Sequence, residues 1–493
     1  MKDGVDAHRL IVRGGGSAAI GYAIRFGARL LFLFIAARLF GAALFGAYSL
    51  AVAVVELGAA AGGLGLKRLL FKRLDEDRSG RPSAHVLLDA AFVAAAASLG
   101  LAAALMLLLA LPPVWRLAGE TAPALAIVAP MIAGQALLDI FLAATRWKHR
   151  MRYDVLARSL VEPYAALAVT AAAWLAGFEQ TGLLIGYWGG TLAALAYAAA
   201  GARRSLGGFG LGSYRLPRGT FAAILRDSRA ATATDLAAGL FARLDLYLVG
   251  LILGEAPAGI YNLARQMRTP IRQARQAFDG LLTPVVAKTL AAHGPIETGA
   301  AVASASRLIL AIQLPMAVGL AAIGLPLLGW FGPEFAAGYW ALVFLAAAET
   351  ILGAFGISEL IFLYREPAVA LRITLATILV NLVLGAALIV PLGVTGAALA
   401  VLAATAAGAA MRRRALRSRF DVRMPLHYSA APVASAMVAA GAAGLALLAM
   451  GSASEAAAAG VALAAALLAY AAALKLWLRA TGDSLALVKF KAD

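Results

Sequence analysis

Long apolar runs, separated by short segments rich in Lys and Arg, dominate this chain of 493 residues. Most runs hold about 17–25 residues, the length that crosses a bilayer as a helix, and we predict fourteen such spans. They cover residues 17–37, 45–66, 84–111, 122–145, 159–177, 182–202, 230–253, 260–285, 303–325, 339–363, 370–390, 396–411, 430–450 and 457–476. The pattern predicts an all-α polytopic membrane protein.

The distribution of positive charge tests this topology. With the N-terminus in the cytoplasm, 34 of the 43 Lys and Arg residues fall in cytoplasmic segments or at their helix ends. The external loops hold only Arg38 and Arg116, and the other seven lie inside spans. Because cytoplasmic loops of membrane proteins are enriched in Lys and Arg, we expect both termini in the cytoplasm.

Composition narrows the function. Hydrophobic residues make up 62% of the chain and charged residues 14%, which leaves no soluble domain of any size. The net charge of +17 is therefore explained by topology, and we expect no nucleic-acid partner. Cysteine is absent and the five histidines show no metal-ligand spacing, so we predict no metal and no cofactor. The external loops are too short for a catalytic site, and we predict that the chain is not an enzyme.

An internal repeat indicates two halves. The segment GAALFGAYSL, which begins at Gly41, aligns without gaps onto GEAPAGIYNL, which begins at Gly254. Each copy joins an odd span to the next on the external side, so the two halves have the same orientation. We predict an N-terminal six-helix bundle, a glycine-containing cytoplasmic linker, a C-terminal six-helix bundle, and spans thirteen and fourteen with a tail. Their ranges are 1–202, 203–229, 230–425 and 426–493.

Arginines inside the predicted spans are the candidate functional residues. One group lies in the first span and a second group forms a stripe on the eighth, at helical spacing of three and four. At 1.5 Å per residue both groups reach about 8–18 Å into the bilayer, where each Arg facing lipid costs about 2.5–3.5 kcal/mol. Guanidinium groups bind phosphate through a planar fork of donors. We therefore predict an anion site formed by Arg25, Arg29, Arg265, Arg268 and Arg272.

Acidic residues inside the spans support an alternative interpretation, in which the same arginines form structural ion pairs and do not bind a ligand. Glu56, Asp139 and Glu349 are candidates for ion coupling or for pairing with Arg. Pro270 interrupts the arginine stripe and is a candidate hinge, because proline removes a backbone donor. Arg243 is interpreted as structural, and it does not pair with Asp245, which faces another side of the same helix.

Several segments resemble the O-antigen and exopolysaccharide flippases of the multidrug/oligosaccharidyl-lipid/polysaccharide exporter superfamily. They are ARLFGAALFGAYSLAVAVVELGAAAGGLG from Ala37, RLDLYLVGLILGEAPAGIYNLA from Arg243, WFGPEFAAGYWAL from Trp330 and PLGVTGAALA from Pro391. The resemblance implies two six-helix bundles around a central cavity, with two extra C-terminal helices. It also implies export of an undecaprenyl-pyrophosphate-linked oligosaccharide across the bacterial inner membrane. Membrane lipids and polysaccharide polymerase or assembly proteins are the implied partners.

Two other transport functions stay open at this point. A cation-coupled multidrug exporter of the same superfamily should favour acidic groups in its first bundle, whereas the first span here carries Arg25 and Arg29 and no acid. A lipid II flippase is closer in function, and the residues alone separate it poorly from an oligosaccharide flippase. An O-antigen polymerase or ligase would need a large external loop, which this chain lacks.

Overall fold

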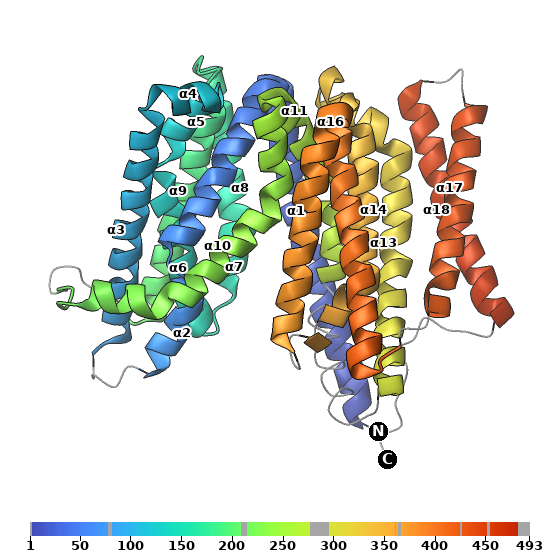
Figure 1. Cartoon of the computed structure of the whole chain (residues 1–493), viewed down its shortest axis with the longest axis horizontal. Coiled ribbons are helices and arrows are strands. Elements are labelled where there is room, and N and C mark those ends of the chain that lie inside the picture. The colour runs from blue at the N-terminus through green and yellow to red at the C-terminus, as the bar shows by residue number, and fades with distance from the viewer. Residues whose placement is uncertain are drawn as a thin grey trace. The chain divides into compact units, whose positions relative to one another are not determined.

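The computed structural model describes residues 2–76, 81–208, 214–276, 295–359, 361–362, 366–423, 426–450 and 454–481. Throughout this part the chain forms helices and turns without strands (Figure 1), which confirms the predicted all-helical fold. The chain divides into two compact units, Ile20–Gly259 and Met1–Ala19 together with Ile260–Asp493. The six-span boundaries expected from the repeat stay a prediction, and each unit is described by itself.

The unit Ile20–Gly259 contains most of α1 and all of the helices up to α10. Its elements are α1 (Lys2–Gly62), α2 (Leu66–Glu76), α3 (Ser83–Leu109), α4 (Pro112–Ala118), α5 (Thr121–Val128), α6 (Met131–Trp147), α7 (Arg152–Leu156), the π-helical turn η1 (Ala157–Val161), α8 (Glu162–Leu175), α9 (Gly182–Ser205) and α10 (Thr220–Leu253). One of its cores joins Val55 of α1, Met131 of α6 and Tyr187 of α9. Alanines of α1, α3 and α5 lie between these larger side chains and let the helices approach.

The other unit comprises Met1–Ala19, at the start of the chain, and Ile260–Asp493, which begins within α11. Its elements are α11 (Glu255–Met267), α13 (Pro295–Phe331), η2 (Pro333–Gly338), α14 (Tyr339–Phe355), η3 (Gly356–Ser358), α16 (Pro367–Phe420), η4 (Leu426–Ser429), α17 (Ala430–Ala449) and α18 (Glu455–Thr481). Alanines of α17 and α18 pack with Ala322 of α13, and the Tyr470 hydroxyl donates to the Ala311 carbonyl at 3.0 Å. The last two helices therefore dock on α13 within their own unit.

The helices coincide with the fourteen predicted spans. In the described part, ten helices are long and apolar enough to cross a membrane, and the bent pair α5–α6 makes an eleventh. Two of the ten are broken by a glycine, α1 at Gly41 and α16 at Gly393, so each supplies two predicted spans. The helix that begins at Glu255 supplies the eighth. The polytopic prediction is confirmed.

The two copies of the repeated motif share one backbone break. Gly41 has φ 71° and ψ 176°, and Gly254, its counterpart in the alignment, has φ 89° and ψ −170°. Such positive φ values are accessible to glycine at little cost. Each glycine ends one helix and lets the next begin at an angle, which explains why the motif occurs between consecutive spans.

The two motif copies also contact each other. A Cβ at Gly46 would lie 1.8 Å from the Glu255 carbonyl oxygen, and a Cβ at Gly259 would lie 2.2 Å from the Ala42 carbonyl oxygen. In the alignment Gly46 corresponds to Gly259 and Ala42 to Glu255, so the contact is reciprocal, as in an isologous interface. The side chain of Glu255 also accepts hydrogen bonds from the backbone and hydroxyl of Thr121, both at 3.2 Å. Glycine is required here because the two backbones touch.

Replacing Gly46 by alanine should destabilise the fold. The added methyl group overlaps backbone atoms that cannot rotate away, and overpacking of this kind costs about 1–3 kcal/mol. We expect a lower unfolding temperature in detergent, measured by intrinsic fluorescence. Gly441→Ala in α17 is the matched control, because a methyl group there meets nothing within 4 Å. Equal unfolding temperatures for the two variants would contradict the close approach.

The segment between α9 and α10 is attached to α3 by Tyr214. Its hydroxyl donates to Asp89 at 2.6 Å, and its ring stacks on Phe92 with centroids 5.2 Å apart. Burial and the hydrogen bond to Asp89 raise the pKa of the Tyr214 phenol, so this group remains a donor. α9 extends into the predicted linker 203–229 as far as Ser205, and α10 begins inside it at Thr220. Residues 209–213, which hold part of its glycine run, lie outside the described residues.

Candidate functional site

A continuous seam joins α1 and α2 to α10 within the unit Ile20–Gly259. We use the word seam for the contact of residues 42–68 with residues 231–259. The two segments run antiparallel, so the residue numbers of two facing residues sum to about 300 along the whole length. At one end Gly65 packs on Ala231, in the middle Ala60 faces Gly239, and further along Leu50 packs on Gly250. Small residues on both sides let the helices approach closely.

Polar contacts reinforce the middle of the seam. Arg243 of α10 forms an ion pair with Glu56 of α1, and the Tyr247 hydroxyl donates to the Ala53 carbonyl at 2.7 Å. Glu56 was predicted as an ion-coupling or arginine-pairing residue, and Arg243 was interpreted as structural. The structure brings these two together, and whether Glu56 has a further role in coupling stays a prediction.

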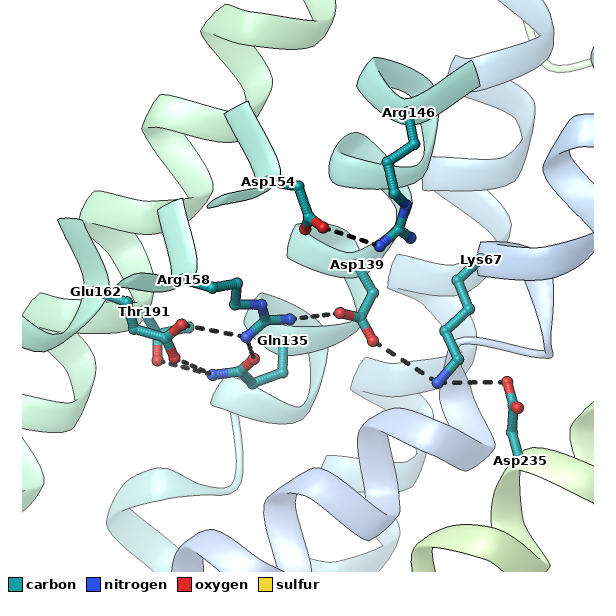
Figure 2. Close-up of polar contacts among 9 residues, drawn as sticks. All are labelled: Lys67, Gln135, Asp139, Arg146, Asp154, Arg158, Glu162, Thr191 and Asp235. Carbon is teal, nitrogen blue, oxygen red and sulfur yellow. Dashed lines mark hydrogen bonds and ion pairs between the residues drawn. The ribbon is translucent and has the colours of Figure 1, made fainter. Parts of the chain in front are cut away.

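A hydrogen-bonded network connects three helices of the same unit (Figure 2). Arg158 forms an ion pair with Asp139 of α6 and donates to Glu162 at 3.1 Å and to Gln135 at 3.2 Å. The Gln135 amide donates in turn to Glu162 at 3.3 Å and to the Thr191 hydroxyl of α9 at 3.2 Å. Each charged group of this set, Arg158, Asp139 and Glu162, is partly exposed and has a partner of opposite charge.

The network is built on an irregular turn. Arg158 lies in the π-helical turn η1 (Ala157–Val161) and Glu162 is the first residue of α8, followed by Pro163. Single π turns inside α-helices are rare and occur frequently at functional sites. The wide turn lets the Arg158 guanidinium reach α6 and its own helix together.

Lys67 extends the network to the seam. Its ammonium group lies 4.0 Å from Asp139 Oδ2 and 3.4 Å from Asp235 Oδ2 of α10 (Figure 2). Arg68 Nη2 approaches the other oxygen of Asp235 at 2.9 Å. The Asp235 side chain is 2% exposed, whereas that of Arg68 is 57% exposed. The buried carboxylate of Asp235 thus links α10 by ion pairs to two cations at the start of α2.

A small cavity lies at this junction. It has about 10 Å³ of room for the centre of a water molecule, and Lys67, Asp139 and Asp235 are its charged lining residues. Small side chains of α1 and α6 form the remaining walls. The space is about that needed for one water with several polar partners.

The second group of predicted residues lies in the other unit. Glu349 of α14 is 1% exposed and accepts hydrogen bonds from Arg272 Nε at 3.0 Å and Nη2 at 2.8 Å. Arg268, 5% exposed, approaches the same carboxylate oxygen at 3.5 Å. The Arg272 side chain remains 39% exposed. The structure therefore places the guanidinium groups of Arg268 and Arg272 around the single carboxylate of Glu349.

The helix that carries these arginines is interrupted beside the predicted hinge. α11 ends at Met267, Arg268 occupies a turn, and the helix resumes at Thr269 before Pro270. The Gln313 amide of α13 donates to the Ile271 carbonyl at 2.8 Å, just beyond the interruption. A break one to two residues before a proline is expected from its missing donor and ring. A hinge function for Pro270 stays a prediction.

The remaining predicted residues are only partly described. Arg29 lies on α1 and Arg265 on α11, and each takes part in an interaction within the protein. Arg25 lies in α1, but its side chain is outside the described part. The structure therefore leaves the predicted anion site, which draws on both units, as a prediction.

Residues 11–288, more than half of the chain, match the family described as Polysaccharide biosynthesis protein. The chain belongs to this polysaccharide biosynthesis family. No curated protein matches it.

Solved structures share the fold of this polysaccharide biosynthesis protein at low sequence identity. Lipid II flippase MurJ in an inward closed conformation has a TM-score of 0.75 and 15% identity, over 94% of this chain and 99% of that one. An inward-facing multidrug resistance MATE family transporter of the MOP superfamily has a TM-score of 0.61 and 13% identity, over 80% and 98%. The MATE multidrug transporter DinF-BH has a TM-score of 0.53 and 16% identity, over 84% and 96%. These similarities show a shared fold, and the long apolar helices make the chain a multi-pass membrane protein.

Two residues of the network in this polysaccharide biosynthesis protein were missed by sequence reasoning. The fifth span was predicted to begin at residue 159, which assigned Arg158 to the cytoplasm, and Glu162 was not considered. The helix begins at Arg152, so both residues lie within it. Their spacing of four residues, with opposite charges, was the available signal.

Proposed function

We propose that the chain is a flippase that moves an undecaprenyl-pyrophosphate-linked oligosaccharide across the bacterial inner membrane by alternating access, with both termini in the cytoplasm. The product would pass to polysaccharide polymerase or assembly proteins of the O-antigen or exopolysaccharide type. The observation that carries the proposal is the group formed by Arg268, Arg272 and Glu349. Two guanidinium groups share one buried carboxylate there.

The charge of this group favours an anionic ligand. Two guanidinium groups, those of Arg268 and Arg272, face the single carboxylate of Glu349, so these three side chains together carry one net positive charge within the predicted eighth and tenth spans. Charges inside a membrane are costly, and they mark substrate or ion pathways. A pyrophosphate carries the complementary charge, whereas a cationic drug would be repelled.

The geometry of Arg272 supports phosphate recognition. Its Nε and Nη2 atoms are the donors to Glu349, while its side chain remains partly exposed. Guanidinium offers five donors in a rigid fork, so one edge can be held by a carboxylate while the rest binds an oxyanion. We propose Arg25, Arg29, Arg265 and Arg268 as further contacts to the pyrophosphate or to acidic sugars.

Deleting the gene in its own bacterium tests the function. We expect the lipid-linked oligosaccharide to accumulate on the cytoplasmic leaflet, because the lipid is made there and cannot cross unaided. The readout is the protection of the lipid-linked sugars from a glycosidase added outside intact spheroplasts, scored after the digestion by lipid extraction, with a complemented strain as control. Accumulation of lipid II instead would identify a lipid II flippase. Unchanged lipid-linked sugars with increased drug sensitivity would favour the multidrug exporter.

A further inference from the structure

Arg116 is one of the two cations, with Arg38, that fall in the predicted external loops. Positive charge is normally kept on the cytoplasmic side of a membrane protein, so its place here calls for a physical reason. Among the described residues, the Arg116 guanidinium forms no hydrogen bond or ion pair. Glu120, the nearest carboxylate in the sequence, lies beyond the end of the same helix and does not pair with it within the described part. The charge of Arg116 is therefore free to meet a ligand.

Arg116 lies on α4, a short helix that turns away from the end of α3 (Figure 1). Leu111, between the two helices, is extended, with φ −78° and ψ 122°, because a pair of prolines follows it. One side of α4 packs inward through Val114 and Ala118, which contact the core shared by α1, α3 and α5. The inward side chains hold α4 in place and leave its other side facing outward.

An open cavity of about 460 Å³ lies between the end of α3, α4 and α5. Its volume is within the range of about 300–1,000 Å³ that small-molecule sites occupy. Apart from Arg116 its lining is apolar or aromatic, and the lining residues are Met106, Leu109, Ala110, Pro112, Trp115, Arg116 and Ala126. One cation in an otherwise apolar lining suits a molecule with an anionic head and an apolar tail.

The outward side of α4 has the composition of a helix at a membrane surface. Trp115 is 44% exposed and Leu117 is 78% exposed. Tryptophan is enriched where the bilayer meets water, and short amphipathic helices lie in that layer. A lipid phosphate lies at the same level, and the acyl chain extends from it toward the apolar interior. The expected depth of α4 therefore matches the two ends of such a ligand.

We propose that the cavity between α3, α4 and α5 binds an anionic phospholipid of the external leaflet. Its phosphate would pair with Arg116, and its acyl chain would lie against Met106 and Leu109. Guanidinium suits a phosphodiester because it donates parallel hydrogen bonds and stays charged. A zwitterionic phospholipid brings its own cation to the phosphate, so it should bind less tightly. The ligand is a resident lipid and not the transported one, so this inference stands apart from the proposed function.

A fluorescent label beside the cavity tests the proposal on the full-length protein in lipid vesicles. The chain has no cysteine, so bimane on Leu117→Cys, an exposed position outside the cavity lining, reports on the adjacent lipid alone. Phosphatidylglycerol and phosphatidylcholine, each with a quenching nitroxide on the acyl chain, are compared in vesicles of unlabelled phosphatidylcholine. We expect the phosphatidylglycerol to bind about fivefold more tightly or better, because its hydrogen bonds to Arg116 are charge-assisted.

Three variants locate the preference. Arg116→Gln should bring the two lipids within about twofold of each other, and Arg116→Lys should keep part of the preference, because it keeps the charge but loses the fork of donors. Arg38→Gln is the matched control, since Arg38 is also exposed and predicted to be external but does not line the cavity. It should behave like the parent. Ala126→Phe should weaken quenching by phosphatidylglycerol with Arg116 in place, because the larger side chain fills the cavity.

Unlabelled competitors identify the ligand. Dioleoyl phosphatidylglycerol should relieve the quenching, whereas inorganic phosphate, which has no acyl chain, should not. Displacement by undecaprenyl phosphate at far lower amounts would assign the site to the carrier lipid and overturn the phospholipid proposal. An undiminished preference in Arg116→Gln, an equal loss in Arg38→Gln, or unchanged quenching in Ala126→Phe would also overturn it.

Discussion

Oxidising a cysteine pair at Ala60→Cys and Gly239→Cys should reduce transport to the level of empty vesicles. A Cβ at Gly239 lies 3.8 Å from the Cβ of Ala60 across the seam, which matches the separation of about 3.8 Å in disulfides. The bond would hold α1 and α10 together, and any transport cycle in which the seam opens would stop. The measurement is flipping of fluorescent lipid-linked oligosaccharide in reconstituted vesicles, before and after a reductant.

A second pair separates this effect from cross-linking in general. A Cβ at Gly182 lies 3.7 Å from the Cβ of Ala173, between α8 and α9, and 2.9 Å from the tip of the Phe40 ring, which must shift slightly to admit it. The pair Ala173→Cys and Gly182→Cys joins α8 to α9, neither of which forms the seam, and should leave transport unchanged. Normal flipping by the oxidised seam pair, with cross-linking verified by mass spectrometry, would show that the seam does not open during transport.

Arg272→Gln should lower transport about 10–100-fold while the protein inserts and folds normally. A charge-assisted hydrogen bond contributes about 1.5–3 kcal/mol, and Arg272 is partly exposed, so its loss leaves the packing intact. The measurement is the same flipping assay, together with the amount of protein in the membrane and its elution profile in detergent.

The double variant Arg272→Gln, Glu349→Gln decides between binding and structure. Glu349→Gln also removes the counter-charge that Arg268 faces at 3.5 Å, so this single variant is the reference. If Arg272 serves only to neutralise Glu349, the double variant should transport as well as Glu349→Gln. If Arg272 contacts the pyrophosphate, the double variant should be as impaired as the single one. Recovery of transport would therefore show that Arg272 is not part of the proposed substrate site.

Hydropathy and charge predicted the spans because the bilayer fixes the length of each apolar helix and the side on which Lys and Arg lie. Both properties can be recognised in each segment of the sequence by itself. The interruptions were also readable from the sequence where a glycine, such as Gly41 or Gly254, is the physical cause. The order of the fourteen helices therefore needed no information about distant contacts.

The polar network could not be predicted in the same way. Lys67, Asp139 and Asp235 are separated by many residues; Lys67 and Asp235 occur near predicted span ends, where a charge is unremarkable, and Asp139 is a candidate inside its span whose partners the sequence does not identify. Their proximity results from the packing of α2, α6 and α10, which only the folded structure shows. The π-helical turn at Arg158 has no sequence signature, so the reach of that side chain was equally hidden.

The reciprocal contact between Gly46 and Gly259 bears on the origin of the molecule. A shorter ancestor with six spans and a single copy of the motif would have met an identical second chain through these same atoms. Gene duplication and fusion then convert a dimer contact into an internal one without altering the surfaces that touch. Both positions are glycine in this chain, as the close approach of the two backbones requires. Steric demand, rather than shared inheritance alone, accounts for their persistence.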